Sequence, residues 1–397
     1  MNLSNERDYD VVIAGAGPSG SAAAIRLSNA GFRVLLVEEK KFPRDKLCGE
    51  FISPECLSHF EELGVMPQLN AVGGADLKET VFYSRSGRAA VIDNRWFGDG
   101  TQQALGLSRS ALDATLLDHC CSVGVDVRQE TSVTNVLNED ECVVGVAIKN
   151  NNGEVAHVSA RLTIDATGRK RSLEKRIGNE KVIPQRAGLV AFKTHIRNAE
   201  VATGVCELFV YRGGYGGSSE VENGLHDLCF IVTSKLTREH GSDAERIMRE
   251  IVMKNPRAAK VLERAVIETP WVAVPIERFG RGRLVPAEGL ITIGDAAAFI
   301  DPFTGSGILL ALESAKVAAS AIRHSFENGF DLEELEMQYR KTYAAAFNRR
   351  LLFCSLLRRT AFVPYLADSM IELLRLSKPL RRQFARATRQ NSQARTK

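Results

Sequence analysis

The sequence lacks the features of several functional classes. Its eight cysteines include no Cys-x-x-Cys pair, which argues against a zinc ribbon or a thioredoxin-like motif. Its seven histidines show no His-Glu-x-x-His spacing, and neither a Ser-His-Asp set nor a metal-ligand cluster is recognisable. Scattered thiols in a chain of 397 residues instead favour a reducing compartment. We therefore expect neither a metal site nor a disulfide framework.

Long apolar runs are missing as well. No run reaches the roughly 20 apolar residues that a membrane-spanning helix needs. The polar start of the chain, MNLSNERDYD, has no apolar signal-peptide core. Together these absences predict a cytoplasmic protein.

The net charge of +4 is distributed unevenly. Residues 340–397 contain 14 Lys and Arg but only two acids, Asp368 and Glu372. This basic segment is either a solvated helical tail or a surface that meets anionic lipid or an acidic partner, which would make a peripheral membrane contact. It contains no recognisable nucleic-acid-binding module, so we expect no nucleic-acid partner.

The first part of the chain contains a nucleotide-binding pattern. Residues 9–42 hold an apolar run, a glycine-rich turn, a helical stretch that ends near Gly31 and a second apolar run. This order predicts a strand, a helix and a second strand, the βαβ unit. The turn reads GAGPSG. A glycine cluster of this kind can also be an ordinary turn, but its place inside a complete βαβ unit favours a dinucleotide site.

Each glycine of this turn has a separate expected role. Gly15 permits the tight turn, Gly17 lets a pyrophosphate approach the backbone, and Gly20 lets the helix pack against the strand. The amides at the start of the helix, including that of Ser19, would face the phosphates. Glu38 lies 18 residues after Gly20, where a carboxylate accepts hydrogen bonds from a ribose.

The middle of the chain predicts a β-sheet. Residues 186–233 alternate apolar and polar side chains, and Asn223-Gly224 marks a tight reversal. A further buried strand, GLITIGD, follows at 289–295, and the pattern is helical from about residue 305 onward. The sheet segment lies between glycine-marked elements, so we expect a discontinuous cofactor domain with an inserted substrate domain.

Three motifs, GAGPSG, DATGRKRS and GDAAAFIDPFTGSGI, occur in this order. Over most of residues 9–320 the chain resembles the FAD-dependent monooxygenase superfamily, which includes aromatic hydroxylases, geranylgeranyl reductases and flavin-dependent halogenases. The resemblance implies an α/β fold with a glutathione-reductase-type Rossmann FAD-binding domain, an inserted antiparallel substrate-binding sheet and a C-terminal helical region. The expected ranges are 1–75, 100–175 and 275–325 for the FAD-binding domain, 76–99 and 176–274 for the substrate domain, and 326–397 for the helical region.

The resemblance also implies contacts with the flavin. Asp295 would hydrogen-bond a ribityl hydroxyl, and Pro302 would break the chain before the next helix. Gly305 and Gly307 would leave room for the flavin ring. The helix start, with the amides of Ser306 and Ile308, would face the carbonyl side of the ring and favour the anionic reduced form.

Further contacts are implied for the rest of the cofactor. Arg109 would reach the FAD phosphates or else lie on the surface. Asp165 and Gly168 match the family turn beside the pyrophosphate, and the backbone of Val133 would meet the adenine.

The segment FPRDKLCGEFISP, residues 42–54, matches two groups in part. Geranylgeranyl reductases resemble it through a Cys-Gly-Gly, and halogenases through a Gly-Glu followed by a proline. Here the residues are Cys48-Gly49-Glu50. Cys48 is either a catalytic residue beside the flavin or a buried packing residue. Arg44 either contacts the cofactor or lies in solvent.

Several reactions are open to this superfamily. A monooxygenase would reduce FAD with NAD(P)H and activate O₂, a reductase would pass hydride to a polyprenyl double bond, and a halogenase would send hypohalous acid to a lysine. The halogenase Trp-x-Trp-x-Ile-Pro motif is matched only partly from Trp271, and Lys78 is typical of a surface lysine. Only Tyr215 matches the aromatic pattern of the reductases. We therefore expect an NAD(P)H-using monooxygenase.

The expected substrate is a hydrophobic aromatic, polyketide or isoprenoid-like molecule. Phe209, Tyr211, Tyr215 and Trp271 either line its pocket or belong to the core. The sequence has no second GxGxxG, so NAD(P)H would bind transiently, and no general base is assigned. GDP-dissociation inhibitors have the same fold, so the chain could also be a non-catalytic prenyl-binding protein, which the three cofactor motifs disfavour.

Overall fold

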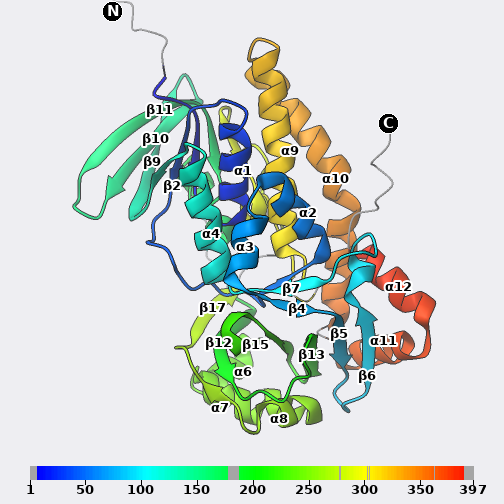
Figure 1. Ribbon diagram of the computed structural model, residues 1–397. Coiled ribbons are helices and arrows are strands. Elements are labelled where there is room, and N and C mark those ends of the chain that lie inside the picture. Colours follow the sequence, from blue (N-terminus) through cyan, green and yellow to red (C-terminus); the bar gives the residue numbers. More distant parts are fainter. Residues whose placement is uncertain are drawn as a thin grey trace, which may run out of the picture.

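The computed structural model describes residues 7–177, 187–276, 279–301, 303, 305–361 and 363–388. Within these residues the molecule is organised around two large sheets, one of seven and one of eight strands. Figure 1 shows the second sheet below the first, with the C-terminal helices beside both. This arrangement agrees with the expected α/β fold.

The first sheet is assembled from segments that are distant in the chain. Its parallel part has the order β8-β2-β1-β11-β19, and an antiparallel ribbon of β10 and β9 continues from the first half of β11. The inner strands are apolar because both faces are covered. Their bounds are Tyr9–Ala14 (β1), Val34–Val37 (β2), Asp126–Arg128 (β8), Thr131–Glu139 (β9), Cys142–Asn150 (β10), Val155–Asp165 (β11) and Leu290–Thr292 (β19).

Helices pack on this sheet and on one another. Pro18 begins α1 because its ring fixes a helical φ and the first helical amides need no partner. Ser108 caps the helix that follows it, its hydroxyl accepting from the Ala111 amide at 3.1 Å. The longest helices, α9 and α10, run side by side (Figure 1). The helices are Pro18–Ser28 (α1), Pro54–Leu63 (α2), Met66–Val72 (α3), Arg109–Ser122 (α4), Glu174–Ile177 (α5), Gly307–Glu327 (α9) and Leu332–Ala361 (α10).

The second sheet has the order β16-β12-β15-β14-β13-β5-β6, with β17 also paired to β12. The reversal between β14 and β15 occurs at Asn223 and Gly224, both at positive φ, as expected. One face of this sheet packs on the short helices α7 and α8. Its strands are Glu79–Tyr83 (β5), Ala89–Asp93 (β6), Leu189–Arg197 (β12), Val205–Tyr211 (β13), Gly214–Glu220 (β14), His226–Thr233 (β15), Val266–Ile267 (β16) and Val272–Ile276 (β17).

The last two helices, α11 and α12, pack on the edge of the second sheet at β6 (Figure 1). The predicted domain boundaries stay predictions, although β5 and β6 join the second sheet as the expected ranges require. The remaining elements are Phe51–Ile52 (β3), Ala75–Leu77 (β4), Ala104–Gly106 (β7), Ser234–Glu239 (α6), Ala244–Glu250 (α7), Pro256–Leu262 (α8), Gly280–Arg281 (β18), Ala298–Phe299 (β20), Pro364–Leu376 (α11) and Lys378–Ala387 (α12).

Candidate active site

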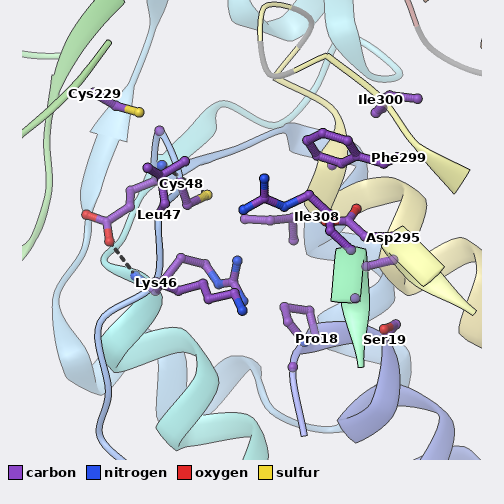
Figure 2. Close-up of a pocket in the computed structure, with 18 of the residues that line it drawn as sticks. Pro18, Ser19, Lys46, Leu47, Cys48, Cys229, Asp295, Phe299, Ile300 and Ile308 are labelled. Carbon is purple, nitrogen blue, oxygen red and sulfur yellow. Dashed lines mark hydrogen bonds between the residues drawn. The ribbon is translucent and has the colours of Figure 1, made fainter. Parts of the chain in front are cut away.

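A cavity of about 580 Å³ is lined by residues of both sheets and by the start of α9. Figure 2 shows Pro18 and Ser19 at one end, Lys46 to Cys48 along one wall, and Asp295, Phe299 and Ile308 on the other. Most residues predicted to contact FAD lie on this cavity. They are Gly15, Gly17, Ser19, Glu38, Arg44, Arg109, Val133, Gly168, Asp295, Gly305, Gly307 and Ile308, together with the predicted catalytic residue Cys48.

The glycine turn has little spare space on the side facing the protein. Gly15 has a φ of +101°, and a Cβ placed on it would lie 2.5 Å from the Ala166 carbonyl oxygen. A Cβ on Gly20 would lie 1.8 Å from the Gly15 carbonyl oxygen. Among the described residues, a Cβ on Gly17 would instead meet only Arg109, at 3.9 Å. Gly17 therefore faces the open cavity, whereas Gly15 and Gly20 are required by the fold.

Glu38 lies at the end of β2 and is buried. One carboxylate oxygen accepts from the Ala16 amide at 2.9 Å and the other from the Lys40 amide at 3.0 Å. These bonds fix the carboxylate at the cavity wall, and each oxygen retains a further lone pair for a ligand hydroxyl.

Arg109 and Arg44 are held together by an acid that the sequence analysis did not single out. The guanidinium of Arg109 donates two hydrogen bonds to Asp113, at 2.8 and 2.9 Å. Arg44 lies 3.3 Å from the same carboxylate and 3.7 Å from Glu38. The structure thus places Arg44 in the cavity wall and not in open solvent. The four-residue spacing of Arg109 and Asp113 on a helix is the signal from which this pair was predictable.

Three predicted contacts lie elsewhere. The carboxylate of Asp165 accepts from the amides of Thr167 and Leu173, so it shapes the turn that holds Gly168. Gly20 and Ser306 are buried and do not line the cavity. Pro302 lies outside the described residues.

The start of α9 is fixed from behind by α10. Arg350 is buried and donates to the Ser306 carbonyl at 3.1 Å and to Glu313 at 2.7 Å. Gly307 and Ile308 then begin the helix on the cavity wall. The first amides of a helix have no partner within it and carry partial positive charge.

Positive charge surrounds this part of the cavity. Lys46, Arg109 and Arg169 all act on Asp295, whose pKa is nevertheless raised, chiefly by burial. Desolvation by the surrounding cavity wall and the neighbouring cations lower the pKa of Lys46 to about 8, although the residue as a whole is exposed. Such a cluster of cations favours an anionic ligand, and a diphosphate meets that requirement.

Cys48 lies on the cavity wall between Lys46 and Glu50. Its Sγ accepts a 3.4 Å hydrogen bond from the Glu50 amide. Burial raises the pKa of the thiol, so Cys48 is protonated at neutral pH. Its expected catalytic role stays a prediction.

The second sheet contributes the other end of the cavity, which we call the chamber. Side chains on one face of this sheet line it: Thr80 and Phe82 from β5, Cys206 and Leu208 from β13, Tyr215 and Ser219 from β14, and Asp227, Cys229 and Ile231 from β15. Phe209 and Tyr211 lie in the core on the opposite face of the sheet, and the half-buried Trp271 packs against that core. Of the four aromatics considered from the sequence, only Tyr215 lines the chamber, because neighbouring residues of a strand point to opposite faces.

Residues 8–340 match the family described as FAD binding domain. The chain belongs to this family and is an FAD-dependent oxidoreductase. The flavoprotein is 28% identical over 345 residues to a digeranylgeranylglycerophospholipid reductase of Methanosarcina acetivorans, with 84% of this chain and 80% of that protein covered.

Solved structures share the fold of the flavoprotein. A geranylgeranyl bacteriochlorophyll reductase-like protein of Thermoplasma acidophilum has a TM-score of 0.80 at 21% identity, with 95% of both chains covered. A triple mutant of the flavin-dependent brominase Bmp2 has a TM-score of 0.79 at 22% identity, with 97% of this chain and 96% of that one covered. These likenesses confirm the expected fold class, and the family match over residues 8–340 confirms the expected superfamily.

The cavity of the flavoprotein fits FAD on its own geometry. The exposed face of Gly17 leaves space beside Arg109, and the nearby cations suit a diphosphate. Val133 and Glu38 line the same cavity at the adenosine end that the sequence predicts, and Asp295 lies toward the start of α9. The individual contacts stay predictions.

Proposed function

We propose that this flavoprotein reduces a carbon–carbon double bond in a hydrophobic, isoprenoid-like or polyketide molecule, with NAD(P)H as a transient reductant. The observation that carries this proposal is the apolar part of the chamber. Phe82, Leu208, Tyr215 and Ile231 line it, and Phe303 packs on Tyr215 at 5.0 Å between ring centroids. The sequence alone favours oxygenation. The named reductase at 28% identity supports reduction instead.

The residues of the chain would bind, orient and protonate the substrate. Reduced FAD supplies a hydride when it is bound. The apolar wall excludes water and takes up the hydrocarbon, and burial stabilises it by about 25 cal/mol per Å². Cys48 holds its proton on Sγ at neutral pH, so its thiol would donate that proton to the carbon that does not receive hydride.

The proposal is tested with purified holoenzyme, NADPH and geranylgeraniol under strict exclusion of O₂. Reduction predicts that a saturated product forms and that one NADPH is consumed per double bond. Cys48→Ser should slow this turnover and retain the flavin. Cys121→Ser, which changes an exposed thiol, should leave the rate unchanged. Absence of any anaerobic product with geranylgeraniol and with unsaturated polyketides would contradict reduction.

Oxygenation is the second candidate, and one feature of the chamber favours it. Asp227 and Ser219 give the chamber a polar side, which suits the hydroxyl of an aromatic substrate. This reaction requires O₂, and oxygen from isotopically labelled O₂ would enter the product. Mass spectrometry of that product therefore separates the two candidates.

Halogenation and non-catalytic prenyl binding have less support. Lys78 is exposed, Trp271 is half-buried against the opposite face of the sheet, and neither lines the cavity. A halogenase lysine would need to face the substrate. A non-catalytic prenyl-binding protein would be isolated without a flavin spectrum, whereas we expect a yellow protein.

We also propose that α11 and α12 contact an anionic membrane surface. Tyr365 and Leu376 expose 77% and 70% of their surface. Lys378, Arg382 and Arg386 lie on α12, which contains no acid. Apolar side chains beside clustered cations are typical of helices that lie on anionic lipid. No helix in the described part of the chain is both long and apolar enough to cross a bilayer.

A further inference from the structure

The polar side of the chamber contains ionisable groups that the proposed reaction does not use. Strand pairing aligns them in a row across the sheet. His195 on β12 is opposite Asp227 on β15, Asp227 is opposite Ser219 on β14, and Ser219 is opposite Cys206 on β13. Cys206 in turn is paired with Thr80 on β5.

In the next rows toward the other end of the sheet, the side chains become progressively less polar. Lys193, Cys229 and Leu208 belong to the adjacent row. Beyond them, Ile231 is opposite Tyr215 in an apolar row. The sheet face therefore changes from polar to apolar over two rows, so the chamber suits a molecule with one polar end.

Glu50 connects the cavity loop to this row. Its carboxylate forms an ion pair with Lys193 and accepts a 2.7 Å hydrogen bond from Nε2 of His195. The same carboxylate accepts from the Arg109 amide at 2.7 Å. Glu50 has a φ of +49°, an unfavourable conformation for a residue with a side chain that indicates a constrained position. Its partners thus hold the loop against the sheet.

Asp227 differs from Glu50 in its hydrogen bonding, because one of its carboxyl oxygens, Oδ1, accepts no hydrogen bond from the described residues. It is 1% exposed and lines the cavity. Its Oδ1 has no hydrogen-bond partner among the residues that the structure describes, and Lys193 Nζ lies 4.0 Å away. Leaving a buried polar atom without a hydrogen bond costs about 1–3 kcal/mol. A ligand atom at this position would remove that cost.

The charge state of this group follows from its surroundings. Burial raises the pKa of the Asp227 carboxyl well above its usual range, and the Glu50 carboxylate raises it further, against the effect of Lys193. His195 and Lys193 outweigh burial and lower the pKa of Glu50. The thiols of Cys48, Cys206 and Cys229 also lie nearby. Lys193 and Glu50 then neutralise each other, and burial beside the Glu50 carboxylate favours the protonated, uncharged form of Asp227.

A metal ion is a competing interpretation of the same residues. One ligand atom from each of Glu50, His195 and Asp227 lies within 4.8 Å of the others. However, the Lys193 ammonium is paired with Glu50 and faces Asp227. A second cation among these ligands would be repelled by it.

We propose that Asp227 binds an uncharged oxygen function of the substrate, a carbonyl or a hydroxyl, and that Glu50, Lys193 and His195 position it. Asp227 can donate to a carbonyl through its O–H or accept from a hydroxyl through Oδ1. The inference deepens the proposed function, on which it rests for the view that the chamber receives a small molecule. It assigns a class of substrate with one uncharged polar end and an apolar remainder.

The test measures binding and not turnover, so it is independent of which reaction occurs. Holoenzyme is titrated by calorimetry with octanol, methyl hexyl ketone, octanoate and octylamine. The two uncharged probes should bind more tightly than the two charged ones, because a charge loses its hydration in the chamber. Asp227→Leu should weaken octanol and the ketone by roughly threefold to tenfold, the value of about one hydrogen bond.

A matched control is available on the same sheet. Glu207 is a buried carboxylate on β13 that faces away from the chamber and pairs with Arg257 at 2.7 Å. Glu207→Gln should leave the affinities of all probes unchanged. Tighter binding of octanoate than octanol, or equal octanol affinity for Asp227→Leu and the unaltered protein, would overturn the proposal.

A second variant covers the case in which Asp227→Leu fails to fold. Asp227→Asn keeps the shape and the hydrogen-bonding capacity, so octanol should still bind. The infrared carbonyl band of a protonated carboxylic acid should be present in the unaltered protein at neutral pH and lost in Asp227→Asn. An unchanged band in that variant would also overturn the assignment. Loss of reductase activity with these binding results intact would instead count against the proposed reaction alone.

Discussion

The three glycines of the GAGPSG turn are subject to different physical constraints. Gly15 and Gly20 face protein backbone at distances that no Cβ tolerates, whereas Gly17 faces the cavity. The sequence predicts all three as a set, because their spacing within a βαβ unit is diagnostic. Only the structure separates those needed for folding from the one that faces the ligand.

This difference leads to a prediction for single substitutions. Gly17→Ala should fold and weaken FAD binding by about fivefold to a hundredfold, since overpacking costs about 1–3 kcal/mol. Gly20→Ala should fail to fold, because its Cβ would lie 1.8 Å from a carbonyl oxygen. Circular dichroism reports folding, and quenching of FAD fluorescence on titration of the apoprotein reports affinity. Unchanged FAD affinity in Gly17→Ala would show that the pyrophosphate does not approach this residue.

Other site residues were less accessible to sequence reasoning. Lys193 and His195 are two residues apart in one apolar strand, and this spacing predicts that their side chains share a face. Asp227 belongs to a different strand, β15. Their meeting with Glu50, however, depends on the pairing of β12 with β15 and on the conformation of a distant loop. Strand register between remote segments is set by tertiary packing, so one sequence does not reveal it.

Among the elements, α10 has a role that its sequence does not indicate. Its pattern predicts a helix, and its basic residues suit a solvated or lipid-facing surface. Arg350 instead points inward to Glu313 and to the Ser306 carbonyl. The helix lies mostly beyond residue 340, where the family match ends. It nevertheless supports the N-terminus of α9 at the cavity.

Arg350→Met should therefore destabilise the protein and weaken FAD binding. Removal of one partner from a buried ion pair is destabilising, by up to about 3–5 kcal/mol. Here Glu313 would lose its ion pair with Arg350, and the Ser306 carbonyl at the start of α9 would lose a donor. The thermal transition should fall and the dissociation constant for FAD should rise. Arg349→Met, on the exposed side of the helix, is the control, and equal behaviour of the two variants would exclude this role.

At the scale of the whole molecule, the C-terminal helices α11 and α12 have exposed side chains on the surface, and α12 also packs against a residue that lines the chamber. Phe384 of α12 packs on Phe82 with ring centroids 5.8 Å apart, and Phe82 lines the chamber. Arg382 lies over the Trp96 ring at 5.5 Å. A membrane contact at α11 and α12 would thus bring a lipid-dissolved substrate close to the apolar part of the chamber.

This contact is tested by sedimentation with lipid vesicles. The protein should bind vesicles that contain phosphatidylglycerol, bind pure phosphatidylcholine weakly, and dissociate as salt is added. Each cation near the surface contributes about 1 kcal/mol, so a double change of Arg382 and Arg386 to Glu should reduce binding at least tenfold. The same charge change at Lys235 and Arg238, on α6, should have little effect. Equal loss in both double variants would indicate a general charge effect and no specific face.

The overall architecture was largely predictable, because long apolar strands and glycine-marked turns carry strong local signals. The order of the three glycine-marked motifs and the presence of a β-sheet between the second and the third were predicted from the sequence. Helix boundaries are harder to predict, as in the region from 243 to 265, where the chain forms α7, a short 3₁₀ segment and α8. Asn255 caps α8 by accepting from the Arg257 amide at 2.9 Å, which separates the helices.

The strand order of the first sheet also has a consequence during synthesis. β11 is flanked by β1, made first, and by β19, which ends at Thr292. The α9 start follows at Gly307. A nascent chain therefore contains both the GAGPSG turn and the start of α9 only after about three quarters of it has left the ribosome. Translation intermediates shorter than this should not retain flavin, and the cofactor should be acquired late, when the two ends of the cavity have come together.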